Sequence, residues 1–369
     1  MKIFFITSPY GYNQVFIPKQ TKVKKKEEIF RKQLIKLSRD MPTSYPSIAI
    51  SGIGSVTVTI IHALHKNAIP FQILCRNESR YQSLKADPIR FQGPNGKAVN
   101  IDLTNHLTMI QENKETFDYI FIGCKNQNLT EYLDETKSLL KPNGKWILIQ
   151  NGIPEQNLGS YKNKILGGVV GWNTQTLPNK TYYQSNVGSL ILGESSGTKP
   201  DPIWNQLLPP YIPLVLTDQL NAYRWHKLAI NSIINGLAAS KQLSLGELFL
   251  NRDYRNEALE TLTEIKLVMN QLNIIEQVVP GSFPIQKLGG GVGALPTWIR
   301  HLILIFLGLK YFRIRTSMVQ DLDHGRKTEI KYINGEVVKI ANGLGIPVPR
   351  NHWIVFKITK LEENQEIKK

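Results

Sequence analysis

The chain contains only two cysteines, Cys75 and Cys124, among its 369 residues. Two thiols cannot supply the disulfide framework of a small secreted protein, and no Cys/His spacing typical of a metal site occurs. Both cysteines fall at the ends of predicted strands, where buried free thiols are expected. The scarcity of cysteine therefore favours a reducing compartment, and we expect a cytoplasmic protein without a bound metal.

Long hydrophobic runs are missing as well. The longest apolar run, Leu302–Leu309, has eight residues and lies between His301 and Lys310, whereas a membrane-spanning helix needs about 20 residues. We interpret this run as a buried helix or as part of the wall of a substrate domain. No membrane partner is expected.

Acidic residues are few relative to basic ones, with 29 Asp and Glu against 45 Lys and Arg and a formal net charge of +16. Residues 1–40 hold ten of the basic residues and three of the acidic ones. We interpret residues 1–46 as a basic extension that is poorly ordered, with Met41 as an alternative start of translation. No basic stretch alternates with exposed aromatic residues as a base-stacking surface would require. An anionic small molecule explains moderate basicity equally well, and we expect no nucleic-acid partner.

The residues that follow the extension read as one strand–turn–helix–strand unit. An apolar strand, Ser47–Ser51, leads into a glycine turn, a helix to about Asn67 and a second strand, Pro70–Cys75. The first glycine of such a turn permits a tight bend, and the second lets a pyrophosphate approach the free N–H groups of the helix N-terminus. The alternative is a glycine turn without a ligand. The residues predicted to bind the dinucleotide here are Gly52, Ile53, Gly54, Ser55, Val56 and Thr57.

Thr57 stands where a third glycine usually serves the packing of helix on strand. We expect a β-branched residue there to hold the helix slightly farther from the strand without removing the phosphate site.

The residue after the second strand distinguishes the two nicotinamide cofactors. An acidic side chain there would bind the ribose 2′-hydroxyl of NAD, whereas Arg76 suits the 2′-phosphate of NADP. Asn77 and Arg80 follow closely and could add to the same pocket. We therefore predict NADP(H) as the cofactor; the alternative is a solvated arginine at a strand end.

Two further strands end in polar residues. Residues 118–124 lead into Lys125, and residues 145–150 lead into Asn151. Ligands of open parallel sheets lie beyond the carboxyl ends of the strands. Both residues are therefore predicted to lie at the cofactor, although exposed turn residues would give a similar pattern.

The sheet is expected to continue through residues 165–171 and through a hairpin-like segment at 182–192, before a linker at 195–202. Residues 47–198 are accordingly predicted to form a Rossmann-type NADP-binding domain. From residue 199 to 369 a period of 3.6 residues dominates and predicts a mainly α-helical substrate and catalytic domain. Its clearest helices are expected near 219–240, 253–273 and 327–344.

A polar ladder interrupts the first of these helices. Lys227, Asn231 and Asn235 recur at four-residue intervals among Leu, Ala and Ile, so they lie on nearly one face of the helix. A buried ammonium and two buried amides are unfavourable unless partners satisfy them. A network within the protein core would provide such partners, and so would an anionic ligand that carries a carbonyl group.

Two later residues complete the candidate site. Ser317 can cap a helix and also present a hydroxyl, and Glu329 reads either as an acid on a helix surface or as part of a site.

The chain resembles the ketopantoate reductase (2-dehydropantoate 2-reductase) family of 2-oxoacid reductases over residues 48–352. The blocks that carry this resemblance stand in the family's order. They are Gly52-x-Gly54, Arg76, Lys125, Asn151-Gly152, Trp225-x-Lys227-Leu-Ala-x-Asn231-x-x-x-Asn235, Ser317-Met-x-Gln-Asp321 and Arg326-x-Thr-Glu329-Ile-x-x-x-Asn-Gly335.

The resemblance implies an α/β fold and a role for each matching residue. It implies that Lys227 donates the proton and that the substrate contacts Asn231, Asn235, Ser317 and Asn151. It further implies cofactor contacts from Lys125, Asn151 and Glu329.

Two departures from the family pattern concern the substrate. A polar residue that contacts substrate is absent near Leu245, and an apolar insertion occupies residues 284–312. The expected activity is NADPH-dependent reduction of a 2-oxoacid, with 2-dehydropantoate as the leading substrate and pantothenate and coenzyme A biosynthesis as its pathway. A paralogue acting on another 2-oxoacid and a non-catalytic NADP-binding protein are the alternatives. The oligomeric state stays open, and a homodimer is one option.

Overall fold

The computed structural model describes residues 45–94 and 96–366. The extension predicted at residues 1–46 therefore falls, but for its last two residues, outside the described residues.

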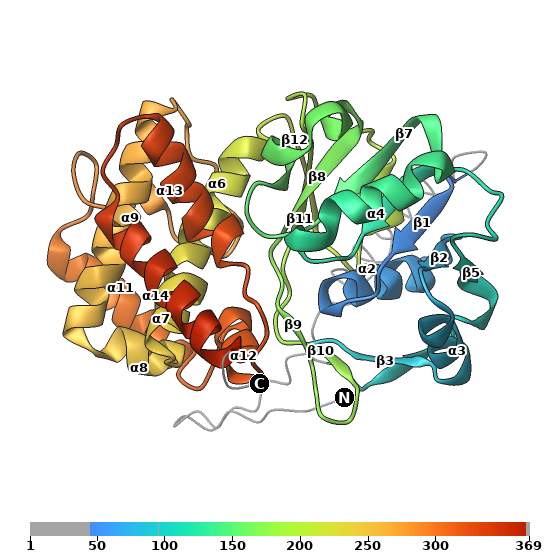
Figure 1. Ribbon diagram of the computed structural model, residues 1–369, viewed down its shortest axis with the longest axis horizontal. Helices are drawn as coiled ribbons and strands as arrows, with labels where there is room; N and C mark the ends of the chain where they lie inside the picture. The colour runs from blue at the N-terminus through green and yellow to red at the C-terminus, as the bar shows by residue number, and fades with distance from the viewer. Residues whose placement is uncertain (1–44, 95, 367–369) are drawn as a thin grey trace, which may run out of the picture. The chain divides into compact units, whose positions relative to one another are not determined.

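A sheet of eight strands forms the first half of the described chain (Figure 1). The strand order is β12-β11-β8-β7-β6-β1-β2-β5, and all neighbouring strands are parallel except β11 and β8. The strands at its centre are apolar and buried on both faces, as is typical of a parallel sheet covered by helices. The strands are β1 Ile48–Ser51, β2 Gln72–Cys75, β5 Leu107–Met109, β6 Phe117–Ile122, β7 Leu140–Leu148, β8 Ile165–Val170, β11 Leu190–Glu194 and β12 Leu214–Thr217.

A smaller sheet with the order β4-β3-β10-β9 packs on helix α2 (Ser55–Lys66). The hydroxyls of Thr59 in α2 and Thr174 in β9 are 3.2 Å apart and form a hydrogen bond. The strands of this sheet are β3 Ile89–Gln92, β4 Val99–Ile101, β9 Thr174–Thr176 and β10 Tyr182–Gln184, and the other helices of this half are α3 Glu78–Ala86, α4 Leu129–Thr136 and α5 Trp204–Leu207.

The prediction of a hairpin-like segment at residues 182–192 is wrong. Strand β10 pairs with β9 and β3 in the small sheet, whereas β11 pairs with β8 and β12 in the large one. Between them the chain crosses from one sheet to the other at Gly188, where a Cβ atom would lie only 2.2 Å from the backbone of Gly171. A glycine that reads as a turn residue thus serves a close approach of two backbones.

The second half is helical, as predicted, and its longest helix, α9, packs against α8, α10, α11, α13 and α14. Asn251 caps α9 by accepting hydrogen bonds from the backbone N–H groups of Asp253 and Tyr254. The helices expected near 219–240 and 253–273 appear within a few residues of their predicted bounds, whereas the helix expected near 327–344 begins only at Asn334, after a short 3-10 turn at Ile330–Tyr332. The helices are α6 Leu220–Asn231, η6 Ser232–Leu237, α7 Ala238–Lys241, α8 Leu245–Leu250, α9 Arg252–Gln271, α10 Ile285–Leu288, α11 Thr297–Lys310, α12 Ser317–Asp323, α13 Asn334–Gly343 and α14 Pro349–Glu366.

The mixed α/β fold with an N-terminal parallel sheet is therefore confirmed. The domain boundary at residues 198–199 stays a prediction. Strand β12, which follows that position in the sequence, still pairs with β11 of the large sheet.

The apolar run at 302–309 lies in α11, and only one face of this helix is covered. Leu304 and Gly308 are buried, whereas Leu302 is 53% exposed and Phe306 is 57% exposed. The expectation of a buried helix is thus wrong for the face that carries Leu302 and Phe306, because α8 and α9 pack against the other face. Within the described ranges, no helix combines the length and the apolar character that crossing a membrane requires.

Both cysteines are free thiols, as expected. Cys75 is buried at the end of β2, and Cys124 is half-buried two residues beyond β6. Burial raises the pKa of Cys124 to about 12, which keeps this thiol protonated at neutral pH.

Candidate active site

Lys227 carries the only charge of the polar ladder. It is half-buried near the C-terminal end of α6, and desolvation lowers the pKa of its amine below the ordinary value. Within residues 45–94 and 96–366, no hydrogen bond or ion pair to this amine is present. The network within the core that would satisfy Lys227 is thus not found in this part of the chain. An ammonium that is partly removed from water and has no partner is unfavourable unless it serves a ligand.

The helix that carries the ladder is not a uniform α-helix. A π-helical segment, η6, follows α6 directly and includes Asn235, which is 7% exposed. Such segments occur often at functional sites, because the wider turn leaves backbone carbonyls available and changes the direction of side chains. Asn334 donates a hydrogen bond of 3.4 Å to the carbonyl of Ser232 in this segment.

Close packing behind the π-segment involves a glycine. A Cβ atom at Gly236 would lie 2.0 Å from the Oδ1 atom of Asn334, so no larger residue fits without a shift. The amide of Asn334 also donates to Asn351, which in turn donates to Glu264. A buried polar chain thus packs against the π-helical segment.

Asn151 and Glu329 lie at the centre of a polar network that joins both halves of the described chain. Asn231 donates from Nδ2 to Oδ1 of Asn151 over 3.2 Å, and Asn151 donates from Nδ2 to Glu329 over 3.3 Å. Asn126 donates from Nδ2 to Glu329 over 3.2 Å and to the carbonyl of Asn151 over 3.0 Å. Three of the predicted residues are therefore in direct contact, and Asn126 is a member that the sequence reasoning missed.

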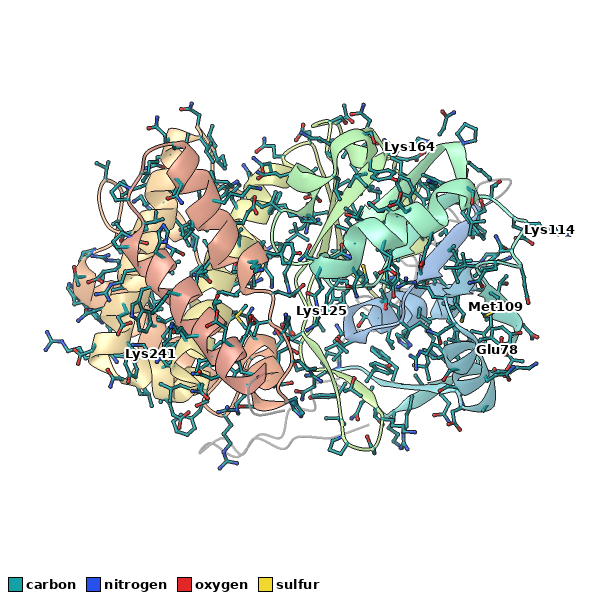
Figure 2. All side chains as sticks on the ribbon, in the orientation of Figure 1. Glu78, Met109, Lys114, Lys125, Lys164 and Lys241 are labelled. Carbon is teal, nitrogen blue, oxygen red and sulfur yellow. The ribbon has the colours of Figure 1, made fainter. Side chains whose placement is uncertain are left out.

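Lys125 makes a second link between the halves (Figure 2). Its Nζ atom donates to Asp321 of α12 over 2.8 Å, and Arg326 contacts the other oxygen of the same carboxylate at 2.9 Å. Asp321 is part of the quoted Ser317 motif, but no role for it was predicted. Its carboxylate holds Lys125 at the carboxyl end of β6.

The glycine turn has the geometry that its spacing predicts. Gly52 adopts a φ of +92°, and Gly54 forms the N-cap of α2. A Cβ atom at Gly123, just beyond β6, would lie 2.0 Å from the carbonyl oxygen of Gly52. The glycine that allows close packing at this turn is therefore Gly123, a residue that was not singled out.

Thr57 contributes to the turn instead of loosening it. Its Oγ1 atom accepts a hydrogen bond of 2.8 Å from the backbone N–H of Gly54 and lies 3.0 Å from the carbonyl of Gly54. The residue is 1% exposed. The looser packing of helix on strand that is expected from Thr57 is thus offset by a capping interaction.

Arg76 is not the solvated arginine of the alternative interpretation. Its Nη2 atom lies 2.5 Å from Glu131 and its Nε atom lies 2.5 Å from Glu135, both on α4. The guanidinium also lies 4.2 Å from the centre of the Tyr132 ring. These three partners were missed, because nothing in the sequence aligns α4 with the end of β2.

Ser317 begins α12 and is exposed. The N-cap is its neighbour Thr316, and neither side chain makes a capping hydrogen bond. The interpretation of Ser317 as a cap is therefore wrong, and its suggested contact with substrate stays a prediction.

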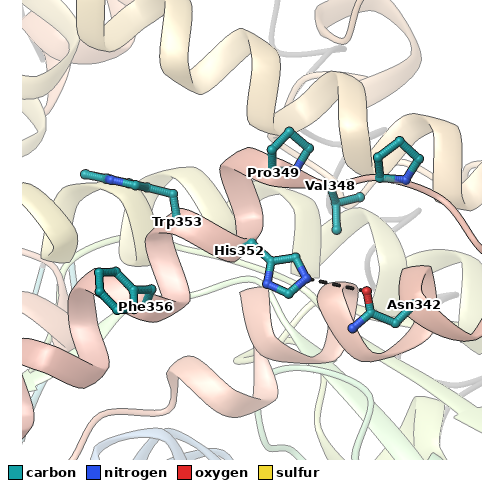
Figure 3. Close-up of a pocket in the computed structure, with 7 residues that line it drawn as sticks. Asn342, Val348, Pro349, His352, Trp353 and Phe356 are labelled. Atoms are coloured by element: carbon teal, nitrogen blue, oxygen red, sulfur yellow. Dashed lines mark hydrogen bonds between the residues drawn. The ribbon is translucent and has the colours of Figure 1, made fainter.

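No metal site is found in the described part of the chain, where no cluster of His, Cys, Asp and Glu side chains could hold an ion. A surface pocket of about 590 Å³ lies between α13 and α14, and His352 and Asn342 form a hydrogen bond of 3.4 Å at its edge (Figure 3). None of the predicted site residues lines it. Its lining is Asn342, Pro347, Val348, Pro349, His352, Trp353 and Phe356.

Comparison with known proteins gives a consistent result. Residues 48–197 match the family described as Ketopantoate reductase PanE/ApbA, and residues 219–362 match the C-terminal part of the same family. A 2-dehydropantoate 2-reductase of Pyrococcus abyssi is 24% identical over 331 residues, which cover 87% of this chain and 99% of that enzyme. A ketoisovalerate reductase of Beauveria bassiana is 28% identical over 155 residues, or 36% of this chain and 34% of that enzyme.

The fold is also found among solved structures. The ternary structure of D-mandelate dehydrogenase with NADH and anilino(oxo)acetate matches with a TM-score of 0.71 and 19% identity, over 87% of this chain and 99% of that one. At this identity the match shows a shared fold.

Proposed function

Because this chain belongs to the ketopantoate reductase family, we propose that it reduces a 2-oxoacid to the 2-hydroxyacid with NADPH, and that 2-dehydropantoate is its leading substrate. Pantoate is then the product, and biosynthesis of pantothenate and coenzyme A is the pathway. The family and the homologues support 2-dehydropantoate 2-reductase or a related 2-oxoacid reductase activity that uses a nicotinamide dinucleotide.

The residues of the glycine turn fit a dinucleotide. Gly52 and Gly123 allow the turn to pack closely on the end of β6, and no acidic residue occupies the first turn of α2. A pyrophosphate is favoured at such a helix N-terminus. Lys125, Asn151 and Glu329, at the ends of β6 and β7 and before α13, would hold the remainder of the cofactor. A bound nicotinamide dinucleotide supplies the hydride for the reduction.

Lys227 provides the proton. Negative charge develops on the carbonyl oxygen of a 2-oxoacid when C2 accepts a hydride, and an ammonium directed at that oxygen stabilises the charge and transfers its proton. The O–H bond forms as the N–H bond breaks, which leaves a neutral amine and the 2-hydroxyacid. Burial, which lowers the pKa of Lys227, makes this transfer easier near neutral pH.

Asn231 and Asn235 would orient the substrate without adding charge. Asn231 already contacts Asn151, which places an amide network next to the lysine. Amide N–H groups donate to a carboxylate while leaving the pKa of the neighbouring amine low. Ser317 is proposed as a further substrate contact. The unpartnered amine of Lys227 beside this network is the observation that carries the proposal.

NADP(H) is proposed in preference to NAD(H) on the strength of Arg76. A guanidinium at the end of β2 suits a 2′-phosphate in charge and geometry. The test is to replace Arg76 with Ala, which should raise the KM for NADPH far more than the KM for NADH. An equal effect on both would contradict this choice of cofactor.

A second candidate substrate is another branched 2-oxoacid, and the surroundings of Leu245 favour it. Leu245 is apolar and 6% exposed, and the hydroxyl of the adjacent Ser244 is engaged in the cap of α8, where it lies 2.7 Å from Glu247. Neither residue offers a free hydroxyl for a polar substituent of the substrate. The similarity to ketoisovalerate reductase points to the same class of compound.

NADPH oxidation measured with a panel of 2-oxoacids distinguishes these candidates. The highest kcat/KM with 2-dehydropantoate supports the leading substrate, and the highest value with 2-oxoisovalerate supports the second. Turnover with none of them would favour a non-catalytic NADP-binding protein. Replacing Lys227 with Ala should lower kcat by about two to four orders of magnitude; nearly normal turnover would refute its assigned role. A homodimer and a cytoplasmic location remain predictions.

A further inference from the structure

Two carboxylates of α4 compete for the arginine that is proposed to bind the 2′-phosphate. Glu131 and Glu135 lie four residues apart on this helix, so both face the end of β2. Their oxygens approach the guanidinium of Arg76 to 2.5 Å. Both ion pairs raise the pKa of Arg76 above its ordinary value.

The same cluster borders the dinucleotide turn. A Cβ atom at Gly52 would lie 3.2 Å from Cε1 of Tyr132, and the guanidinium of Arg76 lies over the ring of this tyrosine. Tyr132 therefore stands between the glycine turn and the arginine. The side chain of Arg76 is 24% exposed, whereas Glu131 is 60% and Glu135 35% exposed, so water screens the pair with Glu131 more than the pair with Glu135.

The net charge of the cluster is not the positive charge that a phosphate-binding site requires. The guanidinium of Arg76 and its two carboxylate partners carry a net charge of −1, and adding Arg80 brings this sum only to zero, whereas a 2′-phosphate is a dianion or close to it. A phosphate bound at Arg76 has to displace at least one carboxylate, and it then lies beside both. A ribose 2′-hydroxyl meets no such repulsion, because a hydroxyl can donate to a carboxylate oxygen.

We propose that Glu131 and Glu135 determine cofactor specificity by opposing the 2′-phosphate, so that Arg76 gives only a narrow preference for NADPH over NADH. This inference rests on the proposed function, since it assumes that a dinucleotide binds at Gly52. The two glutamates position Arg76 and act on the cofactor through charge. They take no part in the reduction.

The test uses a pair of variants of the full chain. In the first variant, Glu131→Gln and Glu135→Gln are combined, which keeps the size of both side chains and removes both charges. The control is Asp134→Asn, which removes a charge from the same helix at a residue that contacts Tyr161 and Lys137 but not Arg76. Dissociation constants are measured by titration for NADPH and NADH, and for the fragments adenosine 2′,5′-bisphosphate and 5′-AMP.

The double variant should bind NADPH and adenosine 2′,5′-bisphosphate at least about tenfold more tightly than the wild type, because two repulsive charges are lost. Binding of NADH and 5′-AMP should change less than about twofold. The control should change neither the ratio of NADPH to NADH affinity nor the ratio of adenosine 2′,5′-bisphosphate to 5′-AMP affinity. In the wild type, added salt should bring the ratio of the two affinities closer to that of the double variant.

An unchanged ratio of NADPH to NADH affinity in the double variant would overturn the inference while leaving the proposed function intact, provided that the wild type binds either cofactor. A wild type that binds neither cofactor nor fragment would overturn both. Circular dichroism of the double variant checks that it is folded, and unchanged NADH binding provides a second check.

Discussion

A buried ion pair next to the candidate site allows a quantitative test of how the two halves are joined. Arg224 of α6 donates to Glu155 at 2.5 Å, to the carbonyl of Gln150 at 2.7 Å and to the carbonyl of Leu148 at 2.9 Å. Arg224 is 2% exposed and Glu155 is 5% exposed. One guanidinium thus fixes the end of β7, and with it Asn151, to the helix that carries Lys227.

Replacing Arg224 with Met keeps much of the apolar volume but leaves a carboxylate and two carbonyls without this donor. Breaking one partner of a buried pair costs about 3–5 kcal/mol, a large part of the roughly 5–15 kcal/mol that stabilises a typical domain. Replacing both partners, with Arg224→Met and Glu155→Leu, removes the stranded charge. The double variant should therefore be more stable than the single variant by at least about 1 kcal/mol.

The assay is urea denaturation followed by circular dichroism, with the free energy of unfolding extrapolated to water. Arg350→Met is the matched control, because Arg350 pairs with Glu260 at an exposed position and should cost less than about 1 kcal/mol. A loss below 1 kcal/mol for Arg224→Met, or a double variant that is less stable than the single one, would refute the reasoning.

Three further variants test the site. Gly123→Ala places a Cβ atom 2.0 Å from the carbonyl of Gly52, so the affinity for the dinucleotide, measured by titration, should fall at least about tenfold. An unchanged affinity for both cofactors would show that the turn adapts to the added methyl group. Thr57→Val removes the hydrogen bond to Gly54 and should lower the free energy of unfolding by about 1 kcal/mol, measured in urea, whereas no change would mean that the hydroxyl is dispensable. Lys227→Met removes an unpaired, partly desolvated cation and should raise the free energy of unfolding by about 1 kcal/mol at pH 7, while lowering kcat by about two to four orders of magnitude. Because burial lowers the pKa of Lys227 in the folded state, the folded wild type binds fewer protons than the unfolded chain between that lowered pKa and 10.5. Its free energy of unfolding should therefore rise with pH in this window relative to that of Lys227→Met. Parallel pH profiles of the two proteins would refute the shift.

Local pattern was sufficient to predict the parts of the fold in which neighbours in sequence are neighbours in space. The strand–turn–helix unit at Gly52 and the helix of Lys227 follow from spacing alone. The lysine helix still differs in detail, since nothing in the residues Ser232–Leu237 distinguishes a π-segment from an α-helix. The hydrogen bond that the carbonyl of Ser232 accepts from Asn334 depends on a residue about 100 positions away in the sequence.

Partners that come from distant elements could not be predicted. Glu131 and Glu135 read as ordinary acids on a helix surface, and only the packing of α4 brings them to Arg76. Gly123 reads as a residue at a strand end, and its role depends on the approach of the Gly52 turn. The exposed side of α11 was misjudged for a related reason, because an apolar run does not reveal how many neighbours cover it.

The links between the halves have a consequence for how the chain matures. Lys125 and Asp321 are separated by 196 positions, and Asn126 and Glu329 by 203. During synthesis the large sheet can be completed once Thr217 has left the ribosome, but these pairings must wait for more than a hundred further residues. Contacts over such distances form slowly, so competence for catalysis should be acquired last, after most of the polypeptide already resists proteolysis.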